Sequence, residues 1–146
     1  MKSTKAVLLL APFILFLSAA GVCAQAVVTA AQVNGTWKLK NRSTDNEFKI
    51  LALGQGKLKV AFDGSYLYRD AQGERSANTG EASGNARIEG TTAIFKPDDT
   101  DDCKITMKFL RGKLIVSEEG SCGFGFNVSS DGAYTRTSAL KPKFEE

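Results

Sequence analysis

Few side chains in this sequence are suited to chemistry. The chain contains no histidine, which excludes catalytic arrangements built on an imidazole base. Its densest carboxylate cluster is the run Pro97–Asp102, where four aspartates stand directly before Cys103. Hard cations take oxygen ligands, but this run lacks the glycine and distal glutamate of the common calcium loop. We interpret it as a solvated hairpin loop, and we expect no metal site, no cofactor and no enzymatic activity.

Two glycine-rich stretches, Gly54–Lys57 and Gly123–Gly125, superficially resemble phosphate-binding loops. Neither has the full spacing of such a loop, and neither precedes a predicted helix whose N-terminus could face an anion. We therefore assign both stretches to turns or bulges.

Residues 1–26 have the three-part organisation of a secretory signal peptide. Lys2 and Lys5 precede an apolar run, and Ala24-Gln25-Ala26 matches the small-x-small pattern of a cleavage site. We expect cleavage near Ala26 and a periplasmic or secreted protein, with cleavage after Ala24 and an uncleaved anchor as alternatives. The apolar run is shorter than the ~20 residues of a membrane span, so we expect no membrane association after cleavage.

Cys23 raises the question of a lipoprotein, because bacterial lipidation occurs on a cysteine that follows a small residue. The preceding residue here is Val22, so we expect Cys23 to leave with the signal peptide. Cys103 and Cys122 then remain, and an even pair in an exported chain predicts a disulfide. It would close a loop of about 20 residues and stabilise the fold by roughly 3 kcal/mol.

The charge of the chain excludes one class of partner. The full sequence has 19 basic and 16 acidic residues, and without Lys2 and Lys5 the balance is 17 to 16. A nearly neutral domain lacks the basic footprint that nucleic acids require. We therefore expect no nucleic-acid partner.

Alternating apolar and polar residues predict an all-β fold. Period-two alternation is typical of half-buried antiparallel strands. It occurs in the segments 33–40, 57–62, 85–88, 104–109 and 113–117, and the segments 48–53 and 92–96 are two further strand candidates. Eight or nine short strands predict a single domain over 27–138, built as a meander closed into a barrel of about eight strands, or as a β-sandwich.

Turn residues separate these segments. Glycine-containing turns are predicted at 54–56, 63–64, 89–90, 111–112 and 131–132. Ser76–Gly84 is the longest polar stretch, and we predict a mobile loop there. Residues 139–146 are assigned to a C-terminal tail, frayed from Lys141 onwards.

Aromatic residues have two interpretations, a ligand pocket or a filled core, and the domain's size favours the core. They are Trp37, Phe62, Tyr66, Tyr68, Phe124, Phe126 and Tyr134. A buried tyrosine needs a partner for its hydroxyl, so we predict that the three tyrosines lie at the mouth or rim of the barrel. We predict that Phe124 and Phe126 face the core.

The segment from Gly80 to Arg136 resembles small exported bacterial domains whose plan is similar to that of the periplasmic lysozyme inhibitors, which are eight-stranded barrels. The resemblance is carried by Gly80-Glu81-Ala82-Ser83-Gly84, by Cys122-Gly123-Phe124-Gly125 and by Asp131-Gly132-Ala133-Tyr134. Asn34-Gly35-Thr36-Trp37 also resembles the first strand of lipocalin-like barrels.

The resemblance implies that a loop with a Ser-Gly-x-Tyr pattern enters the lysozyme cleft. Gly132 and Tyr134 match the Gly-x-Tyr part of that pattern, while Asp131 stands where the serine would be. The predicted contact residues are Ser83, Arg87, Gly132, Tyr134 and Arg136.

We expect a non-enzymatic exported binding domain whose partner is an envelope or extracellular protein, such as a lysozyme-like hydrolase. The alternatives are a lipocalin-like carrier of a small apolar ligand and an envelope protein with a structural or stress role.

Overall fold

The computed structural model describes residues 28–144, and the predicted signal peptide with Cys23 lies outside this range. One short helix and eight strands make up the fold: α1 (Ala30–Val33), β1 (Gly35–Lys40), β2 (Thr44–Gly54), β3 (Lys57–Arg69), β4 (Arg75–Glu89), β5 (Thr92–Phe95), β6 (Cys103–Leu110), β7 (Lys113–Gly120) and β8 (Gly132–Ser138). Each strand pairs antiparallel with the next, and β8 pairs with β1, which closes the barrel. The all-β prediction with about eight strands is confirmed, as a barrel rather than a sandwich.

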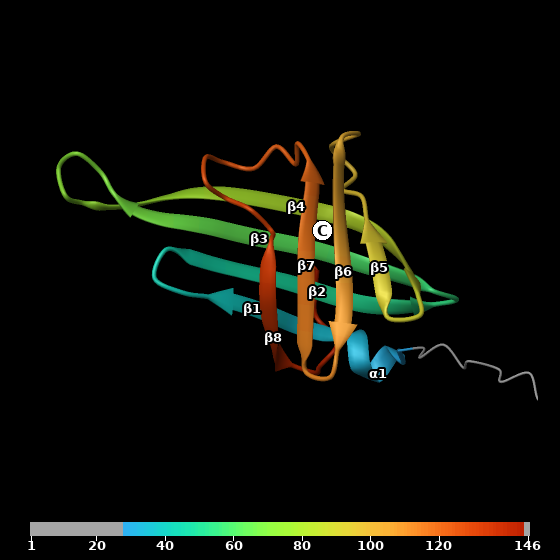
Figure 1. Ribbon diagram of the computed structural model, residues 1–146. Coiled ribbons are helices and arrows are strands. Elements are labelled where there is room, and N and C mark those ends of the chain that lie inside the picture. Colours follow the sequence, from blue (N-terminus) through green and yellow to red (C-terminus); the bar gives the residue numbers. More distant parts are fainter. Residues whose placement is uncertain (1–27, 145–146) are drawn as a thin grey trace, which may run out of the picture.

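The strands differ greatly in length, and this shapes the molecule. β3 and β4 have 13 and 15 residues and pair from Lys57–Arg87 to Arg69–Arg75. Their neighbour β5 has only 4 residues. The β3–β4 hairpin therefore projects well beyond the rest of the barrel (Figure 1).

Inward-facing side chains fill the barrel. The largest fully buried ones are Trp37, Tyr134, Phe48, Phe62, Phe95, Phe109, Ile50, Leu58, Ile105, Met107, Leu114 and Val60. Phe48 contacts both Phe62 and Tyr134, with ring centroids 4.8 and 5.1 Å apart. Burial of this size supplies the main driving force for folding, and it leaves the interior packed with side chains.

Helix α1 lies at one end of the barrel (Figure 1). Its residue Val33 is buried, and the Val33 carbonyl accepts a hydrogen bond from Trp37 Nε1 at 3.0 Å. The buried indole N–H is therefore satisfied without a polar side chain in the core.

The mobile loop predicted at Ser76–Gly84 is wrong, because this segment belongs to β4. Its inward positions are the small residues Gly80, Ala82 and Gly84, which are buried. Small inward residues leave no apolar alternation for a sequence pattern to detect. Gly80 cannot carry a side chain without displacing Phe124, because a Cβ there would lie 2.7 Å from Phe124 Cδ1.

The predicted turn at Asp63-Gly64 is also wrong. Both residues lie inside β3, and a Cβ on Gly64 would lie 2.4 Å from Phe62 Cζ. The chain turns later, between β3 and β4, where Asp70 Oδ1 accepts hydrogen bonds from the Gln72 and Glu74 N–H groups. The turns at 54–56, 89–90 and 111–112 are confirmed.

The C-terminal segment differs from the frayed tail predicted from Lys141. β8 ends at Ser138, and Phe144 then lies against the outside of the barrel, with Lys59 Nζ 4.8 Å from its ring centroid. The segment therefore covers part of the outer face of β2 and β3.

Candidate functional site

The predicted contact residues fall on two separate parts of the barrel. Ser83 and Arg87 are exposed on the outer face of β4. Gly132, Tyr134 and Arg136 belong to β8, which is separated from β4 by three strands in either direction around the barrel. The structure does not bring the five residues together as one site.

Tyr134 does not lie at the rim, so that prediction is wrong. Its side chain is fully buried, its hydroxyl donates to the Ser130 carbonyl at 2.7 Å, and it accepts from Asn46 Nδ2 at 3.2 Å. Burial raises the pKa of its phenol well above the ordinary value. Inward alternation along β8 and these local partners place the ring in the core, where it touches no partner protein.

Arg136 and Gly132 are also occupied by contacts within the fold. The Arg136 guanidinium lies 5.4 Å from the Trp37 ring and donates to the Asn34 carbonyl. A Cβ on Gly132 would lie 2.6 Å from Leu39 Cδ2, so a side chain has no room there. Of the five predicted residues, only Ser83 and Arg87 are exposed, and Arg87 forms a surface ion pair with Glu89 at 3.6 Å.

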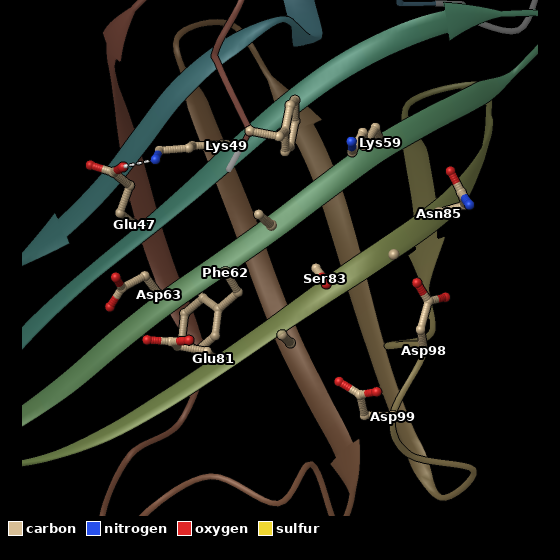
Figure 2. Close-up of a pocket in the computed structure, with 14 residues that line it drawn as sticks. Glu47, Lys49, Lys59, Phe62, Asp63, Glu81, Ser83, Asn85, Asp98 and Asp99 are labelled. Atoms are coloured by element: carbon tan, nitrogen blue, oxygen red, sulfur yellow. Dashed lines mark ion pairs between the residues drawn. The ribbon is translucent and has the colours of Figure 1, made fainter. Parts of the chain in front are cut away.

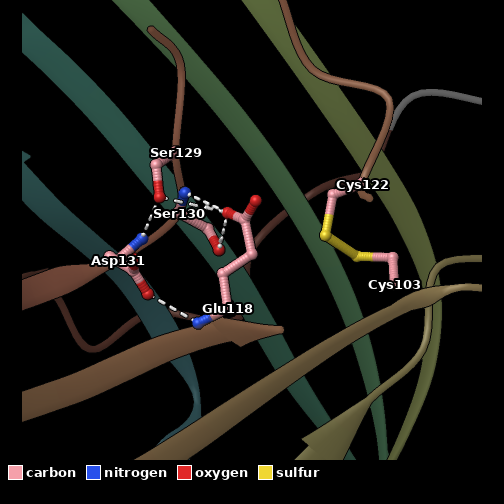
Figure 3. The surroundings of a disulfide bond; sticks show 6 residues. All are labelled: Cys103, Glu118, Cys122, Ser129, Ser130 and Asp131. Carbon is pink, nitrogen blue, oxygen red and sulfur yellow. Dashed lines mark hydrogen bonds between the residues drawn. A yellow bond between two sulfur atoms is a disulfide. The ribbon is translucent and has the colours of Figure 1, made fainter. Parts of the chain in front are cut away.

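The segment Ser121–Asp131, between β7 and β8, is fastened at one end by the predicted disulfide. Cys103 and Cys122 are bonded, with Cα atoms 4.6 Å apart, so the segment is tied to the start of β6 (Figure 3). The Phe124 ring packs on Phe62 at 5.0 Å, over the surface left open by Gly80. Phe124 therefore faces the core, as predicted.

Glu118 fastens the other end of this segment. Its Oε2 accepts hydrogen bonds from the Ser130 N–H at 2.7 Å, the Ser130 hydroxyl at 2.9 Å and the Ser129 hydroxyl at 3.2 Å. Asp131 Oδ1 accepts from the Glu118 N–H at 2.5 Å (Figure 3). Hydrogen bonds to an ionised acceptor are stronger than neutral ones, so this network holds the segment rigidly.

Between these two anchors the chain forms a tight turn that presents Phe126. The Val128 N–H donates to the Gly125 carbonyl at 3.0 Å, and Asn127 has a φ of 63°. The turn is joined to β4, where the Gly125 N–H donates to the Thr79 carbonyl at 2.9 Å and Asn78 Nδ2 donates to the Phe126 carbonyl at 2.7 Å. The backbone around Phe126 is therefore fixed on both sides.

The Phe126 side chain is 80% exposed, so the prediction that it faces the core is wrong. Period-two alternation places Phe124 and Phe126 on one face only if the chain is a strand, and here it turns. Gly125 permits close contact with β4, because a Cβ there would lie 2.6 Å from the Thr79 oxygen. The turn-forming residues Gly125 and Asn127 on either side of Phe126 are the sequence signal that could have identified it.

The projecting hairpin extends the surface around Phe126. Asn78, which holds the Phe126 carbonyl, is opposite Tyr66 in the β3–β4 register, and Ser76 is opposite Tyr68. These four side chains have the same parity, so they share one face of the hairpin. Tyr68 is 39% exposed and its hydroxyl accepts from the Ser76 hydroxyl. We call Phe126, Tyr66 and Tyr68 the aromatic surface.

A second feature, an open groove of about 580 Å³, crosses the outer face of β2, β3 and β4 (Figure 2). Ser83 lies in its floor, and carboxylates line much of its wall. Among residues 28–144, no group of three or more histidine, cysteine, aspartate or glutamate side chains is arranged to hold a metal ion. The groove is thus a polar surface on the outside of the barrel.

The fold and its surfaces define a small closed antiparallel barrel with a disulfide-tied connection and an exposed aromatic turn. Comparisons of the chain with protein-family models, with curated proteins and with solved structures found no significant match. The function must therefore be argued from the geometry.

Within residues 28–144, no helix has the length and apolar character needed to cross a membrane.

Proposed function

We propose that this protein is an exported, non-enzymatic binding domain that recognises a protein partner through the aromatic surface. The observation that carries this proposal is the 80% exposure of Phe126 on a turn whose backbone is fixed by hydrogen bonds to β4. Burying a phenylalanine ring at an interface is worth about 1.5–3 kcal/mol. Because the Phe126 ring is exposed in the free protein, this free energy is gained when a partner buries the ring.

Rigidity increases the affinity that such a residue can supply. Association costs about 0.5–1.5 kcal/mol for each flexible side chain that becomes ordered, and a preformed loop avoids the further cost of ordering its backbone. The disulfide, the Glu118 network and the bonds to β4 preform the Phe126 turn. Tyr66 and Tyr68 add the residue type that is enriched at protein interfaces.

A lysozyme-like hydrolase is the partner class that the sequence resemblance implies. In this structure the Gly132–Tyr134 motif cannot enter a cleft, because the tyrosine is buried. The element that protrudes far enough to enter a cleft is instead the Phe126 turn, together with the neighbouring β3–β4 hairpin. The inhibitor hypothesis therefore now depends on Phe126.

The filled interior weighs against the alternative of a lipocalin-like carrier. A carrier needs an internal cavity, whereas Trp37, Phe48, Phe62 and Phe109 occupy the barrel centre and are at most 2% exposed. We therefore place the ligand-binding surface outside the barrel.

Two assays test the proposal. Micromolar protein should slow c-, g- or i-type lysozyme, and Phe126→Ala should lose that inhibition. If no lysozyme responds, the lysozyme version is refuted. The wider proposal is tested by a photo-cross-linking residue at position 126, which should give discrete protein adducts that the same residue at position 140 does not give. Leu140 is the matched control because it is 79% exposed and follows the opposite end of β8.

A further inference from the structure

The groove on the outer face of the barrel is built by the strand register. Three cross-strand rows lie side by side on β2, β3 and β4, since outward residues alternate along each strand. The middle row is Lys49, Ala61 and Ser83, and it is flanked by the rows Glu47–Asp63–Glu81 and Leu51–Lys59–Asn85. Small side chains on β3 and β4 in the middle row form a floor between two taller walls.

The chain's own C-terminal segment occupies one part of this groove. Phe144 is among the lining residues, and Lys59 Nζ lies 4.8 Å from its ring centroid, which is a cation–π distance. In the described part of the chain, residues 139–144 make one hydrogen bond to a strand, from the Leu140 N–H to Ser138 Oγ at 3.2 Å. The segment is thus held on the outer face mainly by one aromatic ring, and it is suited to displacement.

The remaining part of the groove is strongly acidic. Glu47 forms ion pairs with Lys38 at 2.7 Å and with Lys49 at 3.9 Å, and its hydrogen bond and charge raise the pKa of Lys38. Asp63 and Glu81 have no ion-pair partner among residues 28–144. The two carboxylates are directly opposite each other in the β3–β4 register. Like charges in that position repel, so a cation placed there would be stabilised.

Two further carboxylates belong to the connection between β5 and β6. Asp98 and Asp99 line the groove beside β4, and the Asp98 N–H donates to the Ser83 carbonyl at 3.0 Å, which fixes the position of this loop (Figure 2). The groove thus offers an aromatic position beside Lys59 and a cationic position between Asp63 and Glu81 (Figure 2). Lys59 and Asp63 are four residues apart along β3. At a rise of about 3.3 Å per residue the two positions are separated by about 13 Å, which two or three residues of extended chain and a long lysine or arginine side chain can span.

We infer that this groove binds an extended peptide segment of a partner protein, with an aromatic side chain followed within two or three residues by lysine or arginine. The aromatic side chain takes the place of Phe144, and the basic side chain lies between Asp63 and Glu81. The C-terminal segment is then a built-in competitor that keeps the groove covered until such a segment displaces it. This site is separate from the aromatic surface, because its residues have the opposite parity on β3 and β4.

The test measures peptide binding by full-length protein and by its Phe144→Ala variant, using calorimetry. The probe is the acetylated peptide ALKPKFGKK, which carries the chain's own aromatic motif with a basic continuation. We expect Phe144→Ala to bind it with a Kd below about 100 µM and wild type to bind at least about tenfold more weakly, because a tethered competitor acts at a high effective concentration. Equal affinity for the two proteins, or no binding by Phe144→Ala, would overturn the inference.

Matched controls separate the two positions. In the Phe144→Ala background, the peptide ALKPKFGEE should bind at least about tenfold more weakly than ALKPKFGKK, and Asp63→Asn with Glu81→Gln should remove most of that difference. The peptide ALKPKAGKK should also lose binding. Equal binding of the acidic and basic peptides would contradict the cationic position. Phe126→Ala should leave all of these values unchanged, so failure here is distinguishable from failure of the proposed function.

Discussion

At the scale of the residue, the buried hydroxyl of Tyr134 forms hydrogen bonds that hold the segment between β7 and β8 from inside the core. Its hydroxyl bridges the Ser130 carbonyl and the Asn46 amide, and burial holds its pKa well above the ordinary value. Ser130 in turn is held by Glu118. The buried phenol therefore links the β8 core to the segment that carries Phe126.

This burial predicts a pH dependence of stability. Below about pH 10 the phenol is protonated in both states and contributes no pH dependence; above it, the unfolded chain loses the proton and the folded protein keeps it. The free energy of unfolding should therefore fall by about 1.4 kcal/mol by pH 11 through Tyr134 alone. Urea unfolding at pH 8 and pH 11 should show this extra loss in wild type and not in Tyr134→Phe. The same pH-dependent loss in both proteins would refute the assignment.

A second prediction at this scale concerns Gly80. A methyl group there would collide with the Phe124 ring, so Gly80→Ala should cost about 1–3 kcal/mol of stability. Phe124→Ala removes the obstacle, and the two substitutions together should therefore cost less than the sum of their separate effects. Chemical denaturation of the four proteins measures the coupling, and simple additivity would contradict the packing described.

At the scale of the element, the segment 121–131 holds the Phe126 side chain on the outside of the barrel. It crosses from β7 to β8 while bonded to β4, to β6 through the disulfide, and to Glu118. Phe124 packs inward and Phe126 points outward from the same segment. The anchors thus determine which of the two aromatic rings is available.

Removing the disulfide tests the largest of these anchors. The two cysteines are 19 residues apart, and closing a loop of that size is worth roughly 3 kcal/mol. Cys103→Ser with Cys122→Ser should therefore lower the melting temperature by about 10 °C or more. Circular dichroism of the variant and of reduced wild type checks this, and the two should agree. Unchanged melting of both would contradict the stabilising role.

Strand prediction succeeded where apolar residues alternate and failed where the fold uses small or turning residues. Val60 and Phe62 alternate with polar neighbours in β3, and Ile105, Met107 and Phe109 do so in β6, so these strands were predictable. The inner face of β4 is made of Gly80, Ala82 and Gly84, which carry no periodic signal although Phe124 fills the space above Gly80. That requirement comes from a residue more than forty positions away, which a local pattern does not contain.

The candidate site was predictable only in part, for related reasons. The disulfide pair followed from cysteine count, and Ser83 was placed on an accessible surface. Tyr134 was assigned to the rim because buried hydroxyls need partners, but Ser130 and Asn46 supply those partners inside the fold. Alternation with Phe124 predicts that Phe126 faces the core, but the turn at Gly125–Val128, which is hydrogen-bonded to β4, places it outside.

At the scale of the whole molecule, the barrel has a filled interior and carries two outer surfaces that both include part of the β3–β4 hairpin. The aromatic surface consists of Tyr66 and Tyr68, which have the inward parity of β3, and of Phe126 beside them, whereas the groove uses outward-parity residues of β2, β3 and β4. The interior is filled, so both surfaces act from the outside. We expect the two surfaces to bind independently of each other.

The most direct test of the proposed function is the dissociation constant for the partner captured through position 126, measured with wild type, Phe126→Ala and Leu140→Ala. Both substitutions remove an exposed apolar side chain, 80% and 79% exposed in the free protein, so they differ mainly in location. Phe126→Ala should weaken binding by about thirtyfold, the loss typical of an interface hot spot, and Leu140→Ala by less than about threefold. Equal effects of the two substitutions would contradict a binding role for the Phe126 turn.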